Sequence, residues 1–221
     1  MAVGYLRSNC PNAVLSGPLF FTPYFGKMTP MPLTTPDNIL QEGAPILREK
    51  ARPVTKEEFG TAALRKIIAE MAKALEACDD GVAIAAPQIG VAKRIFLVSH
   101  RAFAIESGRE ARSANSKHPK DKDTVFINPR IVKASRRKIM MPEGCLSVRW
   151  VYGDVPRHEK VTIEALDVEG NKFSVGSSGL MAQIFQHETD HLDGILFIDT
   201  AKHLEQISPE EMEKLGSRLR P

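Results

Sequence analysis

Cysteine is scarce in this sequence, and long apolar runs are missing. The three cysteines, Cys10, Cys78 and Cys145, are scattered over 221 residues, and no apolar secretory segment opens the chain. An odd number of scattered cysteines does not form the framework of a disulfide-stabilised secreted protein, so the sequence predicts a reduced compartment. A membrane-spanning helix needs about 20 consecutive apolar residues, and no run approaches that length, so we expect a soluble protein without a membrane partner.

A strong excess of charge of one sign is missing as well. Charged residues make up 26% of the chain, and the formal net charge is +3. Such a near-balance does not favour a nucleic-acid or membrane-surface partner. A chain of this length can bury a real core within one domain. We therefore expect one folded domain without a direct nucleic-acid site.

The first stretch of the chain lacks acidic residues and regular periodicity. Residues 1–35 carry only Arg7 and Lys27 as charges and are interrupted by prolines. Organelle-targeting segments avoid acids but are richer in arginine than this one. Three interpretations stay open: a targeting segment, a disordered extension, or a start codon assigned too early, with Met28 or Met31 as the true one. We expect a cytoplasmic protein, or an organellar one if this stretch is a transit peptide.

Regular signals begin after this stretch. The capping box at residues 55–58 predicts the start of a helix, which apolar residues at helical spacing continue to about Ala77. The charged residues 99–123 predict a mobile surface insertion with a short helical piece near residues 102–106. Serine and proline at 208 and 209 predict a C-terminal helix. Strand patterns occur at residues 94–98, 125–128, 131–134, 138–141, 161–166 and 172–175.

A histidine motif lies in the longest remaining helical pattern, at residues 179–193. Residues 186–191 read Gln-His-Glu-Thr-Asp-His, so His187 and His191 are four residues apart and project from one face of the helix, with Glu188 beside them. The motif is typical of a metal site with an attached base, although a solvated helix with an incidental triplet is the alternative. The fold class that follows is α+β, with mostly antiparallel strands wrapped around this helix and a helix at the C-terminus.

Cys145 is the candidate third ligand. It stands in the sequence Glu143-Gly144-Cys145-Leu146-Ser147. A thiolate binds first-row divalent metals strongly, and one cysteine with two histidines leaves a fourth position open, as catalytic sites do. The alternative, a buried structural thiol, is the commoner fate of an isolated cysteine. The flanking glycine, the acid and the histidine motif favour the ligand.

Small residues dominate the segment from Gly81 to Gly90. They allow another backbone to approach closely, whether a bound peptide or a neighbouring strand, although a tight loop packed on the core is equally compatible. Gln88 is the one polar side chain in this segment. Among alanines it needs partners, so it is either a structural amide or a donor aimed at a ligand.

Together, these three segments resemble the signature motifs of the peptide deformylases, in the order of that family. They are Gly-x-x-x-Ala-Ala-Pro-Gln-x-Gly at 81–90, Glu-Gly-Cys-Leu-Ser at 143–147 and Gln-His-Glu-x-Asp-His at 186–191, and the resemblance covers residues 36–199. It implies a catalytic domain over residues 36–221 that removes the formyl group from N-formylmethionyl nascent peptides near the ribosome exit. It also implies Fe²⁺ as the cofactor, with Zn²⁺, Ni²⁺ or Co²⁺ as substitutes.

The resemblance assigns a role to each matching residue. Cys145, His187 and His191 become the metal ligands, and Glu188 becomes the general base. The side-chain amide of Gln88 and the backbone N–H of Leu146 become donors to the oxyanion. The substrate-binding residues are expected to be Gly81, Val82, Ala83 and Gly144, which bracket an extended peptide, and Leu180 and Ile184, which share a helix face toward the methionine side chain. Glu143 is expected to pair with Arg157.

Two departures from the family pattern bear on the function. Ala83 stands where the family usually has a second glycine, and Arg149-Trp150 stands where a proline-containing turn is common. The first could alter activity or the accepted first residue, and the second suggests either an exposed groove-rim contact or a Trp packed on its strand. One rival function is a zinc endopeptidase, against which the cysteine ligand argues. The other is a non-catalytic, ribosome-associated metal protein, against which the intact Glu188 and Gln88 argue.

Overall fold

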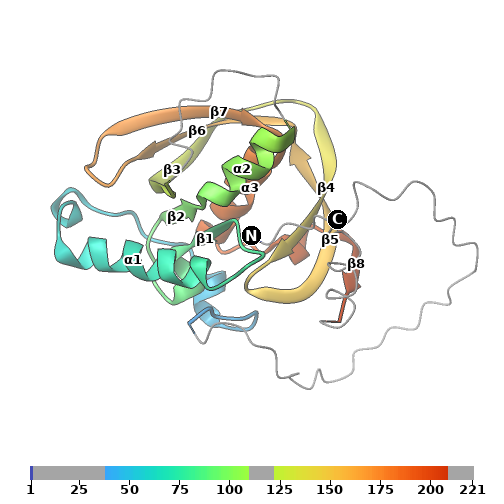
Figure 1. Ribbon diagram of the computed structural model, residues 1–221, viewed down its shortest axis with the longest axis horizontal. Coiled ribbons are helices and arrows are strands. Elements are labelled where there is room, and N and C mark those ends of the chain that lie inside the picture. Colours follow the sequence, from blue (N-terminus) through green and yellow to red (C-terminus); the bar gives the residue numbers. More distant parts are fainter. Residues whose placement is uncertain (2–37, 110–121, 209–221) are drawn as a thin grey trace, which may run out of the picture.

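The computed structural model describes residue 1, residues 38–109 and residues 122–208 (Figure 1). The predictions for residues 2–35, for the rest of the surface insertion and for the C-terminal helix lie outside the described residues. None of the helices in the described part is long and apolar enough to cross a membrane.

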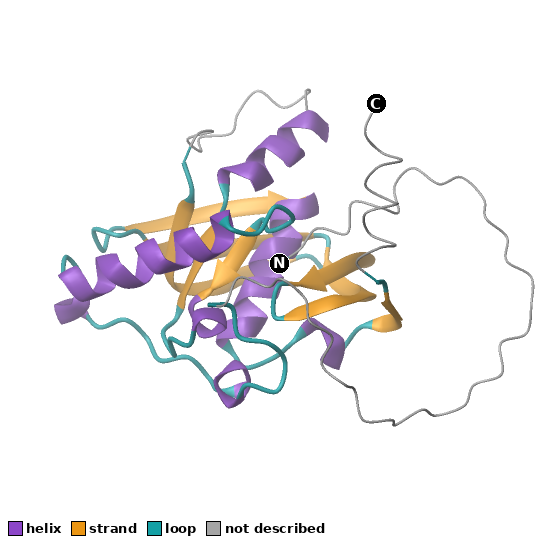
Figure 2. Ribbon diagram, turned by 60° about the horizontal axis from the view of Figure 1, so that its bottom comes forward, coloured by secondary structure: helices purple, strands orange, loops and turns teal. Residues whose placement is uncertain are grey.

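Two antiparallel sheets enclose the histidine helix. The larger sheet has the strand order β1-β2-β3-β6-β7 and the smaller one β4-β5-β8. Both views place α3 (Gly179–Leu192) in the middle of the molecule, with one sheet on either side (Figures 1 and 2). The strands are β1 (Ala83–Ala85), β2 (Ile95–Val98), β3 (Thr124–Ala134), β4 (Lys138–Cys145), β5 (Val148–His158), β6 (Lys160–Leu166), β7 (Lys172–Ser178) and β8 (Lys202–Gln206).

Of the two further helices, one packs on the larger sheet and the other packs mainly against α3. They are α1 (Ala62–Glu76) and α2 (His100–Arg109), and short 3-10 turns occur at η1 (Pro45–Arg48), η2 (Lys56–Glu58), η3 (Ala86–Ile89) and η4 (Phe197–Asp199). Strand β2 is buried on both faces: Ile95 and Leu97 join the apolar cluster of α1, whereas Phe96 and Val98 join that of α3. The sheet therefore separates α1 from the histidine helix, because alternate strand residues point to opposite faces.

Helix α3 is buried on nearly every side, so its polar side chains must find partners in the surrounding strands. Gln186 accepts a hydrogen bond from the His158 backbone N–H (2.8 Å) and donates to the His158 carbonyl (3.0 Å), while Gln183 donates to the Pro142 carbonyl (2.8 Å). A buried amide left without partners costs about 1–3 kcal/mol. These bonds fix the rotation of α3 against β4 and β5, and the orientation of the histidines with it.

The first helix begins later than the sequence predicted. The capping box at Thr55 is present, but it opens only the short turn η2. Gly60 then has φ +71°, outside the helical region, and α1 starts at Ala62, where the Thr61 hydroxyl accepts from the Leu64 N–H (3.2 Å). The prediction of a helix starting at Thr55 was wrong because a second cap lies six residues further on.

The strands are longer and more numerous than predicted. The two patterns at 125–128 and 131–134 are one strand, β3, with register shifts at Ile127/Arg130 and Ile131/Lys133, and β1, β5 and β8 were not predicted. In the segment predicted as a surface insertion, the helix is longer than the predicted piece near residues 102–106. It is α2, and its Ala102 and Phe103 are buried in the core. The α+β fold class, with antiparallel strands around the histidine helix, is confirmed.

Candidate active site

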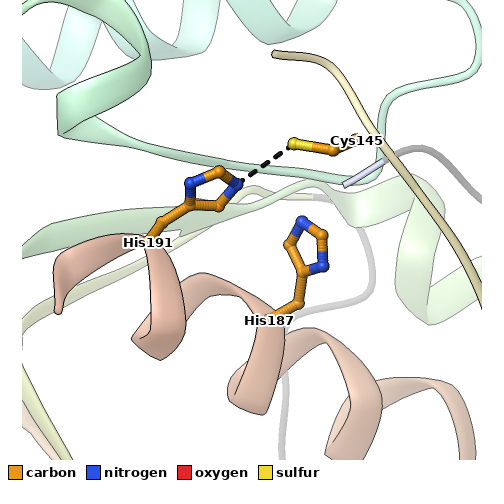
Figure 3. Close-up of side chains that lie close together, drawn as sticks. All are labelled: Cys145, His187 and His191. Atoms are coloured by element: carbon orange, nitrogen blue, oxygen red, sulfur yellow. Dashed lines mark hydrogen bonds between the residues drawn. The ribbon is translucent and has the colours of Figure 1, made fainter. Parts of the chain in front are cut away.

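The three predicted metal ligands come together although they lie on different elements. Cys145 ends β4, and His187 and His191 project from successive turns of α3, so that all three side chains face one point (Figure 3). Their ligand atoms lie within 4.8 Å of one another, and each residue is at most 2% exposed. The Cys145 Sγ lies 3.1 Å from the His191 Nε2. The spacing brings one sulfur and two nitrogens within reach of a single ion.

The chemistry of these donors fits a divalent metal. The Nδ1 of His187 donates to the Glu143 carboxylate (2.9 Å), which turns Nε2 toward the cluster, and this nitrogen is buried without a partner among the described residues. A buried ring nitrogen of this kind is costly unless something binds it. Burial raises the pKa of the Cys145 thiol, but the imidazoles of His191 and His187 outweigh it and hold the pKa well below its ordinary value. A thiolate and an imidazole nitrogen are ligands that Zn²⁺ and Fe²⁺ accept.

A buried ion pair holds His187 in place. Arg157 donates from Nε and Nη2 to the two oxygens of Glu143 (2.7 and 2.9 Å), as predicted, and from Nη1 to Asp190 (2.5 Å). Burial raises the pKa of Glu143, but hydrogen bonds from Arg157 and His187 outweigh it and lower the pKa to about 2. The carboxylate therefore stays ionised and keeps the Nδ1–H tautomer of the histidine, an arrangement that commonly orients metal ligands.

Glu188 lies beside the ligand cluster and is 0% exposed. Burial raises its pKa, but the Met1 amino group and the imidazoles of His187 and His191 outweigh burial, and the pKa is held below its ordinary value. Its Oε1 is 3.1 Å from the amino nitrogen of Met1, and its Oε2 has no hydrogen-bond partner in the described part of the chain. The site thus contains an ionised carboxylate with one oxygen free to accept a proton.

Gln88 also reaches the cluster. Its Oε1 accepts from the Ala85 N–H (2.8 Å), so the amide nitrogen points the other way, toward the Ser147 hydroxyl (3.0 Å) and the Cys145 sulfur (3.7 Å). Leu146 follows Cys145 in the turn between β4 and β5, and its carbonyl accepts from the Gln41 side chain (3.1 Å). Sequence reasoning missed Ser147, whose hydroxyl orients the amide, and Asp190, although both stand inside the motifs.

The first residue of the chain lies between β1 and α3. The amino nitrogen of Met1 donates to the Ala83 carbonyl (2.6 Å), and the Val82 N–H donates to the Met1 carbonyl (3.1 Å). These atoms are the free amine and the first carbonyl of a peptide chain. Met1 is 0% exposed and belongs to the apolar cluster that contains Leu180 and Ile184. Residues 82 and 83 thus bind a backbone by β-type hydrogen bonds.

The other predicted groove residues have different contacts. A Cβ on Gly81 would come within 2.8 Å of the Leu75 side chain and 3.1 Å of Cys78, so a side chain at this position would require Leu75 of α1 to shift. Gly144 is buried in β4 opposite Tyr152. Within the described residues, neither glycine has a hydrogen bond to the Met1 backbone.

The residues that depart from the family pattern have well-defined contacts in the structure. The Ala83 methyl is buried in the core while its carbonyl remains a hydrogen-bond acceptor. The Nη1 of Arg149 donates to both carboxylate oxygens of Asp80 (2.8 and 3.0 Å), and this contact connects the start of β5 to the loop before β1. Trp150 has φ +65° and is only partly exposed, with a buried indole nitrogen. Of the two alternatives for Trp150, this partial burial favours a side chain packed on its strand over an exposed contact at the groove rim.

Comparison with known proteins agrees with this site. A family model described as polypeptide deformylase matches residues 36–207. A peptide deformylase from Symbiobacterium thermophilum is 40% identical over 176 residues, which cover 80% of this chain and 71% of that protein. One from Thermomicrobium roseum is 38% identical and covers 79% of this chain and 93% of that protein.

A solved structure agrees as well. The class I type b peptide deformylase from Acinetobacter baumannii, with Met-Ala-Ser bound, has a TM-score of 0.61 and 32% identity, and the match covers 73% of this chain and 96% of that one. Family model, relatives and fold therefore place this chain in the peptide deformylase family, the metal-dependent hydrolases that remove N-terminal formyl groups.

Proposed function

We propose that this chain hydrolyses the formyl group of N-formylmethionyl nascent peptides, with Glu188 as the group that transfers the proton. The observation that carries the proposal is the Met1 backbone, which lies where a deformylated product would lie, with its amine 3.1 Å from Glu188. The A. baumannii relative with Met-Ala-Ser bound supports a peptide of the same class as the ligand here.

Cys145, His187 and His191 would hold Fe²⁺, or Zn²⁺, Ni²⁺ or Co²⁺ in its place. When bound, the ion supplies Lewis acidity, which polarises a carbonyl and makes water more acidic. The side chains around it keep the ligand geometry fixed, since Glu143 orients His187 and Ser147 donates its backbone N–H to the Cys145 sulfur (3.4 Å).

Glu188 would transfer a proton from the attacking water to the departing amine. A carbon–oxygen bond forms from water to the formyl carbon, the carbon–nitrogen bond breaks, formate leaves, and the amine receives the proton. A base must be ionised to act, and the lowered pKa of Glu188 meets this condition at neutral pH. Glu188 could reach both the water and the amine, because its Oε1 faces the amine and its Oε2 has no hydrogen-bond partner in the described part of the site.

Gln88 and Leu146 would stabilise the charge that develops on the formyl oxygen. The amide nitrogen of Gln88 is directed toward Cys145 by the bond between its oxygen and the Ala85 N–H, so no reorientation is needed during the reaction. The backbone N–H of Leu146, next to the ligand, would be the second donor. Removing one such donor typically costs about 100-fold to 1000-fold in rate.

Substrate recognition would depend mainly on the peptide backbone. Val82 and Ala83 would bind the first residue by main-chain hydrogen bonds, with Gly81 and Gly144 at the borders of the groove, so many sequences after the first residue would be accepted. Leu180 and Ile184 would line the pocket for the methionine side chain.

The protein would act as a monomer near the ribosome exit. Its location would be the cytoplasm or, if residues 1–35 are a transit peptide, an organelle.

The proposal is tested by formate release. Protein purified without oxygen and loaded in turn with each metal is mixed with formyl-Met-Ala-Ser, and separately with an unformylated peptide that offers only internal bonds. We expect formate from the first and no cleavage of the second. Cleavage of internal bonds would favour the endopeptidase, and absence of formate at every metal loading would refute the proposal.

A further inference from the structure

The amino-terminal methionine of this chain fills its own catalytic cleft. Its ammonium group contacts both the Ala83 carbonyl and the Glu188 carboxylate, and its carbonyl accepts from the Val82 N–H. Figures 1 and 2 mark this end of the chain in the interior, beside α3. The residue makes a complete set of backbone contacts and is fully buried, as a bound ligand would be.

The charge of the amino group makes this binding selective. The side-chain exposures at the ion pair between Met1 and Glu188 are 1% and 0%. A buried ammonium is costly unless an opposite charge and hydrogen bonds compensate it, and both are present here. An additional residue before Met1 would remove the charge that pairs with Glu188 and would place a group larger than a formyl group toward the metal ligands, so we expect it to weaken this binding.

We propose that the chain binds its own first methionine in cis, as a tethered product that competes with peptide substrates. This inference rests on the proposed function, because the cleft that Met1 fills is the one assigned to the formylated peptide. The connecting residues 2–37 could reach on the order of 100 Å if extended, so their length does not prevent the contact. A ligand on the same chain has an effective concentration that does not depend on the protein concentration, on the order of 1 mM for a short connection and lower for a longer one.

Self-binding has a defined kinetic signature. Only molecules with an open cleft can bind a peptide, so the apparent KM rises by the inverse of the open fraction, while kcat stays the same. If half of the molecules are closed, abolishing self-binding lowers KM by about twofold, and by more if a larger fraction is closed.

The first test measures occupancy without relying on catalysis. An amine-selective reagent is applied to the native chain, and labelling of the Met1 amine is followed by mass spectrometry, with the 77% exposed Lys66 as internal reference. We expect the Met1 amine to react at least about twofold more slowly than in the urea-unfolded chain, and Met-Ala-Ser to restore its reactivity. Labelling at the unfolded rate would overturn the proposal. Protection that is lost on dilution would place a second copy's methionine in the cleft and overturn the cis assignment.

The second test measures competition. A variant with one glycine before Met1, left by cleavage of a removable tag, is compared with a control that carries one glycine after Pro221. We expect KM for formyl-Met-Ala-Ser to fall by about twofold or more in the first, with kcat unchanged, and neither constant to change in the control. An unchanged KM in the glycine-first variant would contradict competition. If no variant releases formate, the proposed function fails, and the labelling test still decides whether Met1 occupies the cleft.

Discussion

Glu143 and Arg157 do not face the reacting atoms, yet the catalytic geometry depends on them. Glu143 is 0% exposed and joins Arg157 to His187, and Arg157 extends the network to Asp190 on the same helix. Removing one partner of a buried pair leaves an uncompensated charge, which costs more than the pair itself contributes. The pair therefore couples β5 to the ligand helix.

Arg157→Met tests this coupling. We expect the free energy of unfolding to fall by about 3–5 kcal/mol, because the Glu143 charge is left buried, and metal affinity to fall by about 10-fold to 100-fold, because His187 loses its orientation. Urea unfolding and a metal titration measure the two effects. Arg130→Met is the control: Arg130 is 74% exposed and contacts Glu164 at 3.4 Å, so its replacement should change stability by about 0.5 kcal/mol or less.

Glu188→Ala tests the assigned base. The carboxylate is not among the three metal-ligand residues, so the variant should keep its metal content while formate release falls by at least about 100-fold. Atomic absorption and a formate assay on the same preparation measure both. Glu76→Ala, at the exposed end of α1, should leave both unchanged. Wild-type turnover in Glu188→Ala would mean that another group transfers the proton.

The elements follow the sequence where local and tertiary signals agree. The limits of α3 were predicted to within one residue, because its helical pattern and its histidine motif indicate the same helix. Strand β5 was missed because Gly153 and Pro156 are poor strand residues. A Cβ on Gly153 would lie 2.9 Å from the Leu204 side chain and 3.0 Å from Ala201, so a side chain at this position would require the neighbouring residues to shift. That reason is tertiary and cannot be read from the local sequence.

The candidate site also contains residues that the sequence could predict and residues that it could not. Residue type and spacing identified the cluster of Cys145, His187 and His191, because a helix places residues four apart on one face and a thiolate is a natural third ligand. Spacing could not indicate that Ser147 orients Gln88, since that contact depends on how η3 packs against the turn after β4. The position of Met1 in the cleft had no signal in the sequence either.

Helix α3 ends in a Schellman motif centred on Gly194. The Ile195 N–H donates to the Asp190 carbonyl (2.9 Å), the Gly194 N–H to the His191 carbonyl (3.2 Å), and Gly194 has φ +76°. A Cβ at this glycine would lie 2.6 Å from the Arg48 carbonyl oxygen. Because that oxygen belongs to the backbone, the clash cannot be relieved by a side-chain rotation.

Gly194→Ala should therefore destabilise the protein by more than the backbone conformation alone requires. A left-handed residue costs roughly 1–2 kcal/mol when glycine is replaced, and the clash adds to this. Gly60→Ala is the matched control, with φ +71° and no atom within 4 Å of the added Cβ. Urea unfolding should show a clearly larger loss for Gly194→Ala. Equal losses would show that the contact with Arg48 is relieved without cost.

At the scale of the molecule, the ligand cluster connects the smaller sheet to helix α3, which otherwise contact each other through side chains. Cys145 comes from the smaller sheet, and both histidines come from the helix between the sheets. An ion bound by all three would tie the smaller sheet to that helix. Because the three ligands come together only in the folded state, such an ion binds the folded chain more tightly than the unfolded one, and its binding free energy adds to stability.

Metal removal is therefore expected to lower the unfolding temperature. An ion present at 1000 times its dissociation constant stabilises by about 4 kcal/mol, and for a chain of this size each kcal/mol shifts the midpoint by roughly 2–4 °C. Thermal unfolding followed by circular dichroism, with Ni²⁺ or with a chelator, should thus differ by about 10 °C. Cys145→Ser should lose this metal-dependent shift, whereas Cys78→Ser should keep it, since Cys78 is also buried but lies outside the ligand cluster. An equal shift in both variants would mean that the ion stabilises the fold without the Cys145 sulfur.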